Sequence, residues 1–165
     1  MVLADPSPEA GRWLWLFPAS YAVHIADEGL TGEGFYRWIG RISGREITPR
    51  AFVGFNLAYL AAMTVLVRRA TRRSDAAWLL PALGAVTATN GCGHAIGSVA
   101  TRTYSPGLAS GIGLWAPLGA VALARTHREL ARDVWRRGIA AGLLINAVVA
   151  ILALAVSHRP ATGGS

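Results

Sequence analysis

The 165-residue sequence contains no lysine, a single cysteine and few charged residues of either sign. All 16 basic residues other than histidine are therefore arginines. The lone Cys92 excludes an intrachain disulfide, so cysteine pairing says nothing about the redox compartment. Only 15% of the residues are charged whereas 53% are hydrophobic, and the mean hydropathy is +0.38. This balance exceeds that of ordinary soluble domains and favours an integral membrane protein.

The excess of basic residues does not indicate a nucleic-acid partner. A formal net charge of +7 and a sequence pI of 11.0 are values that nucleic-acid-binding proteins also show. Here, however, the arginines flank apolar runs instead of forming one basic face with interleaved aromatic residues. We therefore expect no nucleic acid, and we expect the lipid bilayer to be the main partner.

Five apolar runs approach the length of about 20 residues that a membrane-crossing helix requires. They cover residues 13–30, 51–67, 76–100, 108–124 and 139–156. The sequence therefore predicts a single all-α membrane domain over residues 1–165, a helical bundle with five transmembrane helices. Because the acidic Asp5 and Glu9 precede the first run and no small-residue cleavage motif follows it, we expect that run to be retained and not removed as a signal peptide.

Arginine density predicts the topology of this bundle. Segments 68–75 and 125–137 are short, rich in arginine and separate apolar runs, so the positive-inside rule assigns both to the cytoplasmic side. Five crossings then put the N-terminus inside and the C-terminus outside, and Arg12 beside the first run agrees with that orientation. We expect a multi-pass protein of the cytoplasmic membrane.

A short amphipathic helix is predicted at residues 34–44. Phe35, Trp38, Ile39 and Ile42 follow the spacing i, i+3, i+4 and i+7, which places them in one apolar stripe. Such a helix either lies on the outer membrane surface or caps the bundle at that end.

The first run carries three ionisable residues, His24, Asp27 and Glu28, at the spacing i, i+3 and i+4, so that they share one helix face. The third run carries Asn90 and His94, which are also one turn apart. With a rise of about 1.5 Å per residue, Glu28 and His94 reach similar levels in the outer half of the bundle. We therefore expect the two helices to join these side chains in one polar site.

Two further residues are expected beside this site. Asn56 reaches a comparable level on the second run, and we expect Asn56 and Asn90 to orient a substrate or the histidines. Arg102 follows the third run, and we expect it to lie close to Glu28 or Asp27, because a cation there would offset the buried negative charge.

Several kinds of chemistry suit this set of side chains. His24, Glu28 and His94 offer imidazole and carboxylate ligands of the kind that bind zinc, iron or manganese. Glu28, Asp27, His24 and His94 also suit acid-base catalysis without metal, or a proton relay in a transporter. The spacing H-x-x-D-E differs from the zinc-protease pattern H-E-x-x-H, so the motif itself names no reaction.

The stretch HIADE at residues 24–28 resembles the motif of the HXXEE domain family of bacterial membrane proteins, with Asp27 in place of the first glutamate. The stretch from Asn90 through His94 to "YSPG" at 104–107 is similar to a second recognisable region of that family. The resemblance implies a bacterial multi-pass membrane protein in which His24, Glu28 and His94 are important. The family's function is essentially unknown, so the resemblance implies no reaction.

The leading hypothesis from the sequence is a small membrane enzyme that acts on a lipophilic substrate by metal-assisted or acid-base chemistry. One alternative is a proton-coupled transporter or channel component, in which polar residues should continue toward the cytoplasmic face. Another is a structural membrane subunit in which the ionisable cluster is only an ion-pair network, and such a bundle should leave no cavity beside Glu28.

Overall fold

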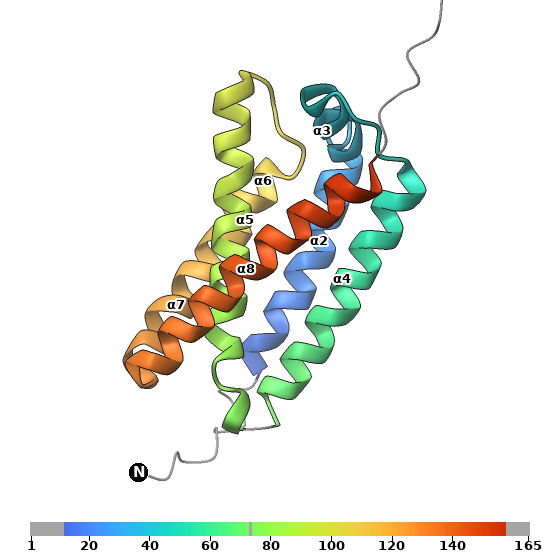
Figure 1. Ribbon diagram of the computed structural model, residues 1–165. Helices are drawn as coiled ribbons and strands as arrows, with labels where there is room; N and C mark the ends of the chain where they lie inside the picture. The colour runs from blue at the N-terminus through green and yellow to red at the C-terminus, as the bar shows by residue number, and fades with distance from the viewer. Residues whose placement is uncertain (1–11, 73, 158–165) are drawn as a thin grey trace, which may run out of the picture.

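The computed structural model describes residues 12–72 and 74–157 of the chain, and these form an all-α bundle (Figure 1). The signal-peptide prediction rests on Asp5 and Glu9, which lie outside the described residues. The elements are the short η1 (Trp13–Trp15), α2 (Leu16–Leu30), α3 (Phe35–Ser43), α4 (Pro49–Ala70), the short η2 (Ser74–Ala76), α5 (Leu79–Thr101), α6 (Leu108–Ser110), the π-helical η3 (Gly111–Trp115), α7 (Ala116–Glu129) and α8 (Arg132–Val156).

Each of the five apolar runs forms a helix, but the predicted loop at 125–137 is mostly helical. Helix α7 continues to Glu129 and α8 begins at Arg132, so only Leu130 and Ala131 separate them. Arginine, alanine and glutamate are strong helix formers, which explains why this charged segment stays helical. The connection between α7 and α8 is therefore much shorter than the 13-residue charged segment 125–137.

Helix α5 is the central element, because α7 packs along one side of it and α8 along another. Small residues allow this close approach. A Cβ atom placed on Gly142 of α8 would lie 2.4 Å from the carbonyl oxygen of Ala82, and one on Gly91 would lie 2.4 Å from that of Gly111. Helix α2 lies on the other side of the bundle, where it packs against α4 and contacts α6 and η3.

Helix α3 caps the bundle at the upper end in Figure 1. Its Trp38 is buried, packs over Gly97 of α5, and donates a hydrogen bond from Nε1 to Thr103 Oγ1 at 3.0 Å. Gly34 precedes the helix and Gly44 ends it, both with positive φ, as a sharp entry and a left-handed C-cap require. The apolar stripe of α3 thus faces the bundle.

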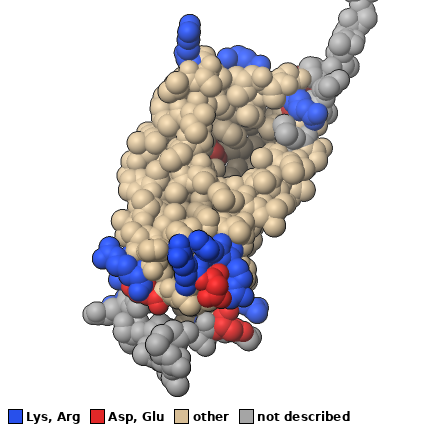
Figure 2. Space-filling model, turned by 60° about the vertical axis from the view of Figure 1, so that its left-hand side comes forward, with Lys and Arg blue, Asp and Glu red and all other residues tan. Residues whose placement is uncertain are grey.

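Three helices are long and apolar enough to cross a membrane by length and composition: Pro49–Ala70, Leu108–Glu129 and Arg132–Ala153. Helices α2 and α5, which carry the polar residues of the predicted site, are not among these three. Helix α2 has only 15 residues, and α5 includes the polar Asn90 and His94. Figure 2 shows a broad uncharged band with charged side chains gathered at its two ends.

The apolar core fills the end of the bundle where α2 begins. Its buried members come from the first turns of α2 and α5 and the last turns of α4, with contributions from η1, η3 and α7: Leu14, Phe17, Tyr21, Met63, Val67, Leu83, Trp115 and Ala122. Polar side chains gather instead toward the other half, where His24, Glu28 and His94 are buried.

Candidate functional site

Helices α2 and α5 bring two histidines and one carboxylate together. His24 and Glu28 lie one turn apart on α2, and His94 faces them from α5. Glu28 Oε1 is 3.3 Å from His94 Nε2 and 3.6 Å from His24 Nε2. One ligand atom from each residue lies within 4.8 Å of the other two, and all three residues are buried. The structure thus joins the three residues that the sequence suggested as metal ligands.

Ser110 fixes the ring of His24 from the side opposite Glu28. Its Oγ lies 2.7 Å from His24 Nδ1 and donates its hydrogen to Asp27 Oδ2 at 2.6 Å, while its backbone N–H donates to the same carboxylate oxygen at 2.8 Å. Because the hydroxyl hydrogen is used by Asp27, Nδ1 of His24 must be the donor toward Ser110. In a neutral ring with its hydrogen on Nδ1, the lone pair of Nε2 faces the oxygens of Glu28 and Asn90, an arrangement that needs a proton or a cation between them.

His94 is held in the same way by a different serine. Its Nδ1 lies 3.0 Å from Ser105 Oγ, and the backbone N–H of Ser105 donates to Ser98 Oγ at 2.9 Å. Both histidines therefore have Nδ1 occupied by a serine hydroxyl and Nε2 directed toward Glu28. Hydrogen bonds of this kind on the remote nitrogen fix tautomer and ring orientation in metal-binding histidines.

Gly107 brings the backbone of the α5–α6 turn directly against this cluster. Its φ is +92°, and a Cβ atom there would lie 2.8 Å from Glu28 Cγ, 2.8 Å from His94 Cε1 and 3.1 Å from His24 Cε1. Only glycine combines this left-handed backbone with so close an approach. The turn therefore closes one side of the cluster with backbone atoms.

Aromatic rings cover two further sides. The π-helical segment η3 places Trp115 in a stacked position on the ring of His24, with the centroids 4.5 Å apart. Phe35 of α3 lies against His94 at a centroid distance of 5.3 Å. Irregular π-helical turns often occur at functional sites, and here the turn carries a ring that excludes water from one face of His24.

A cavity of about 560 Å³ opens beside the cluster. Polar side chains gather in one part of its lining: Tyr21, His24, Glu28, Asn56, Asn90 and His94. Apolar side chains from α3, α4 and α8 form much of the remaining wall, among them Phe35, Ile39, Ile42, Phe55, Val149 and Ala153. Figure 2 shows a hollow in the uncharged band with an acidic atom in its depth, and Glu28 is the acidic residue of the lining.

Two asparagines present amides at the cavity. Asn56 is fixed by a hydrogen bond from its Nδ2 to the carbonyl oxygen of Phe52, and its Oδ1 accepts a short hydrogen bond from the hydroxyl of Tyr21. Asn90 Oδ1 lies 3.0 Å from His24 Nε2. Both asparagines thus line the cavity beside the cluster, and Asn90 contacts His24 directly.

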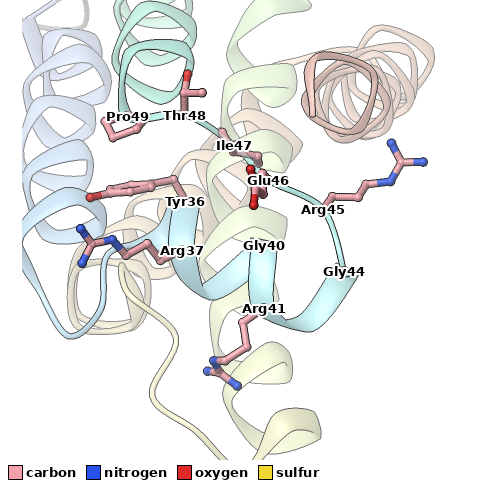
Figure 3. A pocket seen from close by; sticks show the side chains of 10 residues that line it. All are labelled: Tyr36, Arg37, Gly40, Arg41, Gly44, Arg45, Glu46, Ile47, Thr48 and Pro49. Carbon is pink, nitrogen blue, oxygen red and sulfur yellow. The ribbon is translucent and has the colours of Figure 1, made fainter. Parts of the chain in front are cut away.

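A second hollow of about 620 Å³ lies outside the bundle, between α3 and the start of α4 (Figure 3). Its arginines point outward, and Arg41 pairs with the exposed Glu33. Hydrogen bonds from Arg41 hold the pKa of the Glu33 carboxyl below its usual range. This hollow contains no residue of the buried cluster, and it shares only Ile47 with the lining of the cavity beside that cluster. The described residues of its lining include no histidine and no buried carboxylate.

Two predicted residues occupy other positions than expected. Asp27 is on α2 beside Glu28 but points to Ser110, so it acts on His24 through that serine and not on His94. Adjacent helical residues diverge by about 100°, which explains this separation. Arg102 does not pair with Glu28 or Asp27: it is the exposed left-handed C-cap of α5, and within the described residues Glu28 forms ion pairs with the two histidines alone.

Sequence reasoning did not identify Ser105, Gly107, Ser110, Trp115 and Tyr21 as members of the site. Ser105 and Gly107 belong to the stretch YSPG, whose composition is explained equally well by a simple turn. No local spacing distinguishes a serine that holds a histidine from any other loop serine.

The distances from Glu28 Oε1 to the two histidine nitrogens are longer than typical charged hydrogen bonds and lie in the range of two ligands that share one ion. Charged N–H···O bonds are typically about 2.7–2.9 Å long, whereas the nitrogens lie 3.3 and 3.6 Å from Glu28 Oε1. Ligands at about 2.0–2.2 Å from a tetrahedral metal are about 3.3–3.6 Å from one another. The buried carboxylate also needs a positive charge, and a cation or a protonated imidazole would supply it.

The comparison with family models gives one match, "Protein of unknown function with HXXEE motif", over residues 15–122. The match contains α2 with its motif residues and the whole segment from α5 to η3, and hence every residue of the cluster described above. No curated protein and no solved structure matches the chain. Because the matched region covers more than half of the chain and includes the motif His24-Ile25-Ala26-Asp27-Glu28, the chain belongs to the HXXEE family, whose function is unknown.

Proposed function

We propose that this protein is a membrane enzyme that binds a divalent metal ion through His24, Glu28 and His94 and acts on a lipophilic substrate in the adjoining cavity. The observation that carries the proposal is the convergence of three ligand atoms within 4.8 Å on the wall of a cavity of about 560 Å³. Two histidines and one carboxylate form the ligand set of several catalytic zinc and non-haem iron sites.

The ligand set supports catalysis more than a purely structural metal. Three protein ligands leave at least one position of a four-coordinate ion for water or substrate. In such a site the metal lowers the pKa of its bound water or polarises an oxygen of the substrate. Zinc, iron and manganese all accept this combination of nitrogen and oxygen ligands.

We place this enzyme in the membrane with five crossings, the N-terminus and the arginine-rich turns on the cytoplasmic side, and the C-terminus outside. Three of these crossings are supported by helix length and composition. The other two, the 15-residue α2 and the longer α5, hold the polar site on the faces that they turn toward each other. The cluster then lies in the outer half of the bilayer.

Two alternatives have less support. A proton pathway should continue with polar groups toward the cytoplasmic end, but there the described residues form the apolar core of Leu14, Phe17, Met63 and Val67. A structural ion-pair network has no need of a cavity, yet one lies beside Glu28.

A third alternative, acid-base catalysis without a metal, is supported by the contact between His24 Nε2 and Asn90 Oδ1. A protonated His24 would donate from Nδ1 to Ser110 and from Nε2 to Asn90, so both of its N–H groups have partners. This arrangement would make Glu28 or His94 the base that faces a substrate in the cavity.

Metal analysis of the purified protein separates these two forms of the proposal. The protein is prepared without chelators and with an affinity tag that lacks histidine, and zinc, iron and manganese are counted per chain. We expect about one ion per chain and its loss in folded His24→Ala and His94→Ala variants. His127→Ala, which changes an exposed histidine at the far end of α7, is the matched control and should keep the metal. A metal-free wild type that turns over substrate would overturn the metal site and leave the acid-base form.

A further inference from the structure

The lining of the cavity carries few charged side chains. Among the described residues, Glu28 is its one acidic member, and arginine is absent from the lining. Phosphate and sulfate groups are normally held by several arginine or lysine donors. The hollow with arginines lies between α3 and the start of α4, and its Arg45 donates a hydrogen bond to Ser157 Oγ in the cavity wall at 3.3 Å (Figure 3). Within the described part of the chain, a phosphorylated headgroup would therefore find no arginine beside Glu28.

The polar groups that do line the cavity are neutral donors and acceptors. Tyr21 and Asn56 form one hydrogen-bonded pair, Asn90 lies against His24, and Asn146 of α8 donates to Thr89 and to the carbonyl oxygen of Val86. Amides and phenols suit a hydroxyl or carbonyl oxygen, with which they exchange uncharged hydrogen bonds. The polar end of the cavity thus matches an uncharged oxygen.

The volume of the cavity limits how many atoms of a bound lipid it can enclose. About 560 Å³ accommodates about 20 non-hydrogen atoms, if each takes roughly the 30 Å³ share of a water molecule in the liquid. A phospholipid with two acyl chains contains far more atoms. Ile39, Phe55 and Val149 and their apolar neighbours form most of the cavity wall. The part of a bound molecule that lies against this wall is therefore expected to be hydrocarbon.

The cavity opens on the side of the bundle and not at a charged end. Figure 2 shows the hollow within the uncharged band. Thr89 and Gly93 of α5 and Ala150 of α8 line it and are exposed, and a Cβ atom on Gly93 would have no neighbour within 4 Å. In the membrane arrangement proposed above, this opening faces hydrocarbon, so a molecule dissolved in the bilayer enters without crossing water.

We propose that the cavity binds an uncharged lipid with a single hydroxyl or carbonyl oxygen on a hydrocarbon body of about 20 non-hydrogen atoms, taken up laterally from the bilayer with its oxygen toward Glu28. The inference rests on the proposed function in so far as the oxygen is the reacting group. It extends that function by naming the substrate class, in preference to phospholipids and lipid anions, whose headgroups would meet only the proposed metal ion and no arginine among the described residues of the lining.

Photolabelling of the full-length protein in lipid nanodiscs tests this inference. The probe is a sixteen-carbon alcohol with a diazirine in its chain, and the matched probes are the corresponding fatty acid and a phosphatidylcholine with the same diazirine-bearing chain. We expect the alcohol to label peptides from α4 and α8 that line the cavity about tenfold more than either matched probe. Equal labelling of these peptides by the fatty acid or the phosphatidylcholine would overturn the proposed class.

A pair of variants on α8 controls for labelling from bulk lipid. Ala150 lines the cavity and Ala147 does not, while both are exposed on the same helix. Ala150→Trp should fill the opening and remove most of the labelling, whereas Ala147→Trp should leave it unchanged. Equal labelling of the two variants would show that the probe reports bulk lipid and would overturn binding in the cavity.

Metal content measured on the same preparations keeps the two proposals apart. Ala150→Trp changes no ligand, so we expect it to retain the ion while it loses the alcohol. Alcohol labelling in a protein that contains no metal supports the lipid class and overturns only the metal site. A metal-loaded protein without cavity labelling overturns the lipid class and leaves the metal site.

Discussion

Glu28 Oε1 lies 3.3 Å from His94 Nε2, although 65 residues, among them the helices α3 and α4, separate the two in the sequence. The contact joins the motif of the first helix to a histidine that lies outside the motif. The turn after α5 then supplies Ser105 and Gly107 around the same two side chains. The cluster is therefore a property of two helices and one turn together.

Glu28→Gln should abolish metal binding while preserving the shape of the site. An amide is a much weaker ligand than a carboxylate for these metals and no longer balances their charge, so we expect affinity for zinc to fall by at least about 100-fold. Titration calorimetry on protein in detergent measures the change. Glu33→Gln alters an exposed carboxylate and serves as control. Unchanged affinity in Glu28→Gln would show that Glu28 is not a ligand.

Ser110→Ala should weaken metal binding although Ser110 is not itself a proposed ligand. The variant frees Nδ1 of His24 and breaks its connection to Asp27, so the tautomer with a lone pair on Nε2 is no longer favoured. Loss of such a partner typically lowers metal affinity by about 10- to 100-fold. Ser20→Ala removes another buried serine of the bundle, whose hydroxyl bonds only to the Phe17 carbonyl. If both variants bind zinc like the wild type, Ser110 does not position His24.

Gly107→Ala should destabilise the protein and disturb the cluster. The new methyl group would overlap Glu28 and His94, and the positive φ adds backbone strain, so we expect a loss of about 1–3 kcal/mol or more in unfolding free energy. Thermal unfolding in detergent and metal content give the two readouts. Gly54→Ala on α4 meets no neighbouring atom and should keep or raise the melting temperature. A Gly107→Ala variant as stable and metal-loaded as the wild type would contradict the packing described above.

Arg102→Gly should leave metal binding intact and should not lower thermal stability. Arg102 has a φ of 53° at the C-cap of α5, a conformation that glycine adopts without the strain of about 1–2 kcal/mol that other residues pay. Greater freedom of glycine in the unfolded chain offsets part of that gain. Loss of metal or of folded yield in this variant would restore the earlier expectation that Arg102 compensates Glu28.

Cysteine labelling tests the orientation of the bundle. In a Cys92→Ser background, single cysteines at Arg72 and Glu129 should react with a membrane-impermeant thiol reagent only after cells are permeabilised. A cysteine at Arg50, in the first turn of α4 at the opposite end of the bundle, should react in intact cells. All three positions are exposed. The reverse pattern would invert the topology.

Several features follow directly from the amino-acid sequence because they depend on neighbouring residues. Each of the five apolar runs is helical over most of its length, and the spacing of His24 and Glu28 alone puts them on one face of α2. Counting residues along the two helices predicts that Glu28 and His94 lie at similar levels, because a helix rises by a constant amount per residue. The contact between the two side chains agrees with this prediction. The apolar stripe of α3 likewise predicted which side of that helix faces the bundle.

The tertiary structure decided which other residues join the site. Asp27 shares the motif with Glu28 but reaches Ser110, and Arg102 turns outward at the end of α5. Ser110 and Gly107 reach α2 because η3 and α7 pack closely on α5, where the Gly111 backbone meets Gly91. Helical periodicity is encoded by consecutive residues, whereas the distance between a turn and a helix about 80 residues earlier depends on close packing of whole helices, which no local spacing specifies.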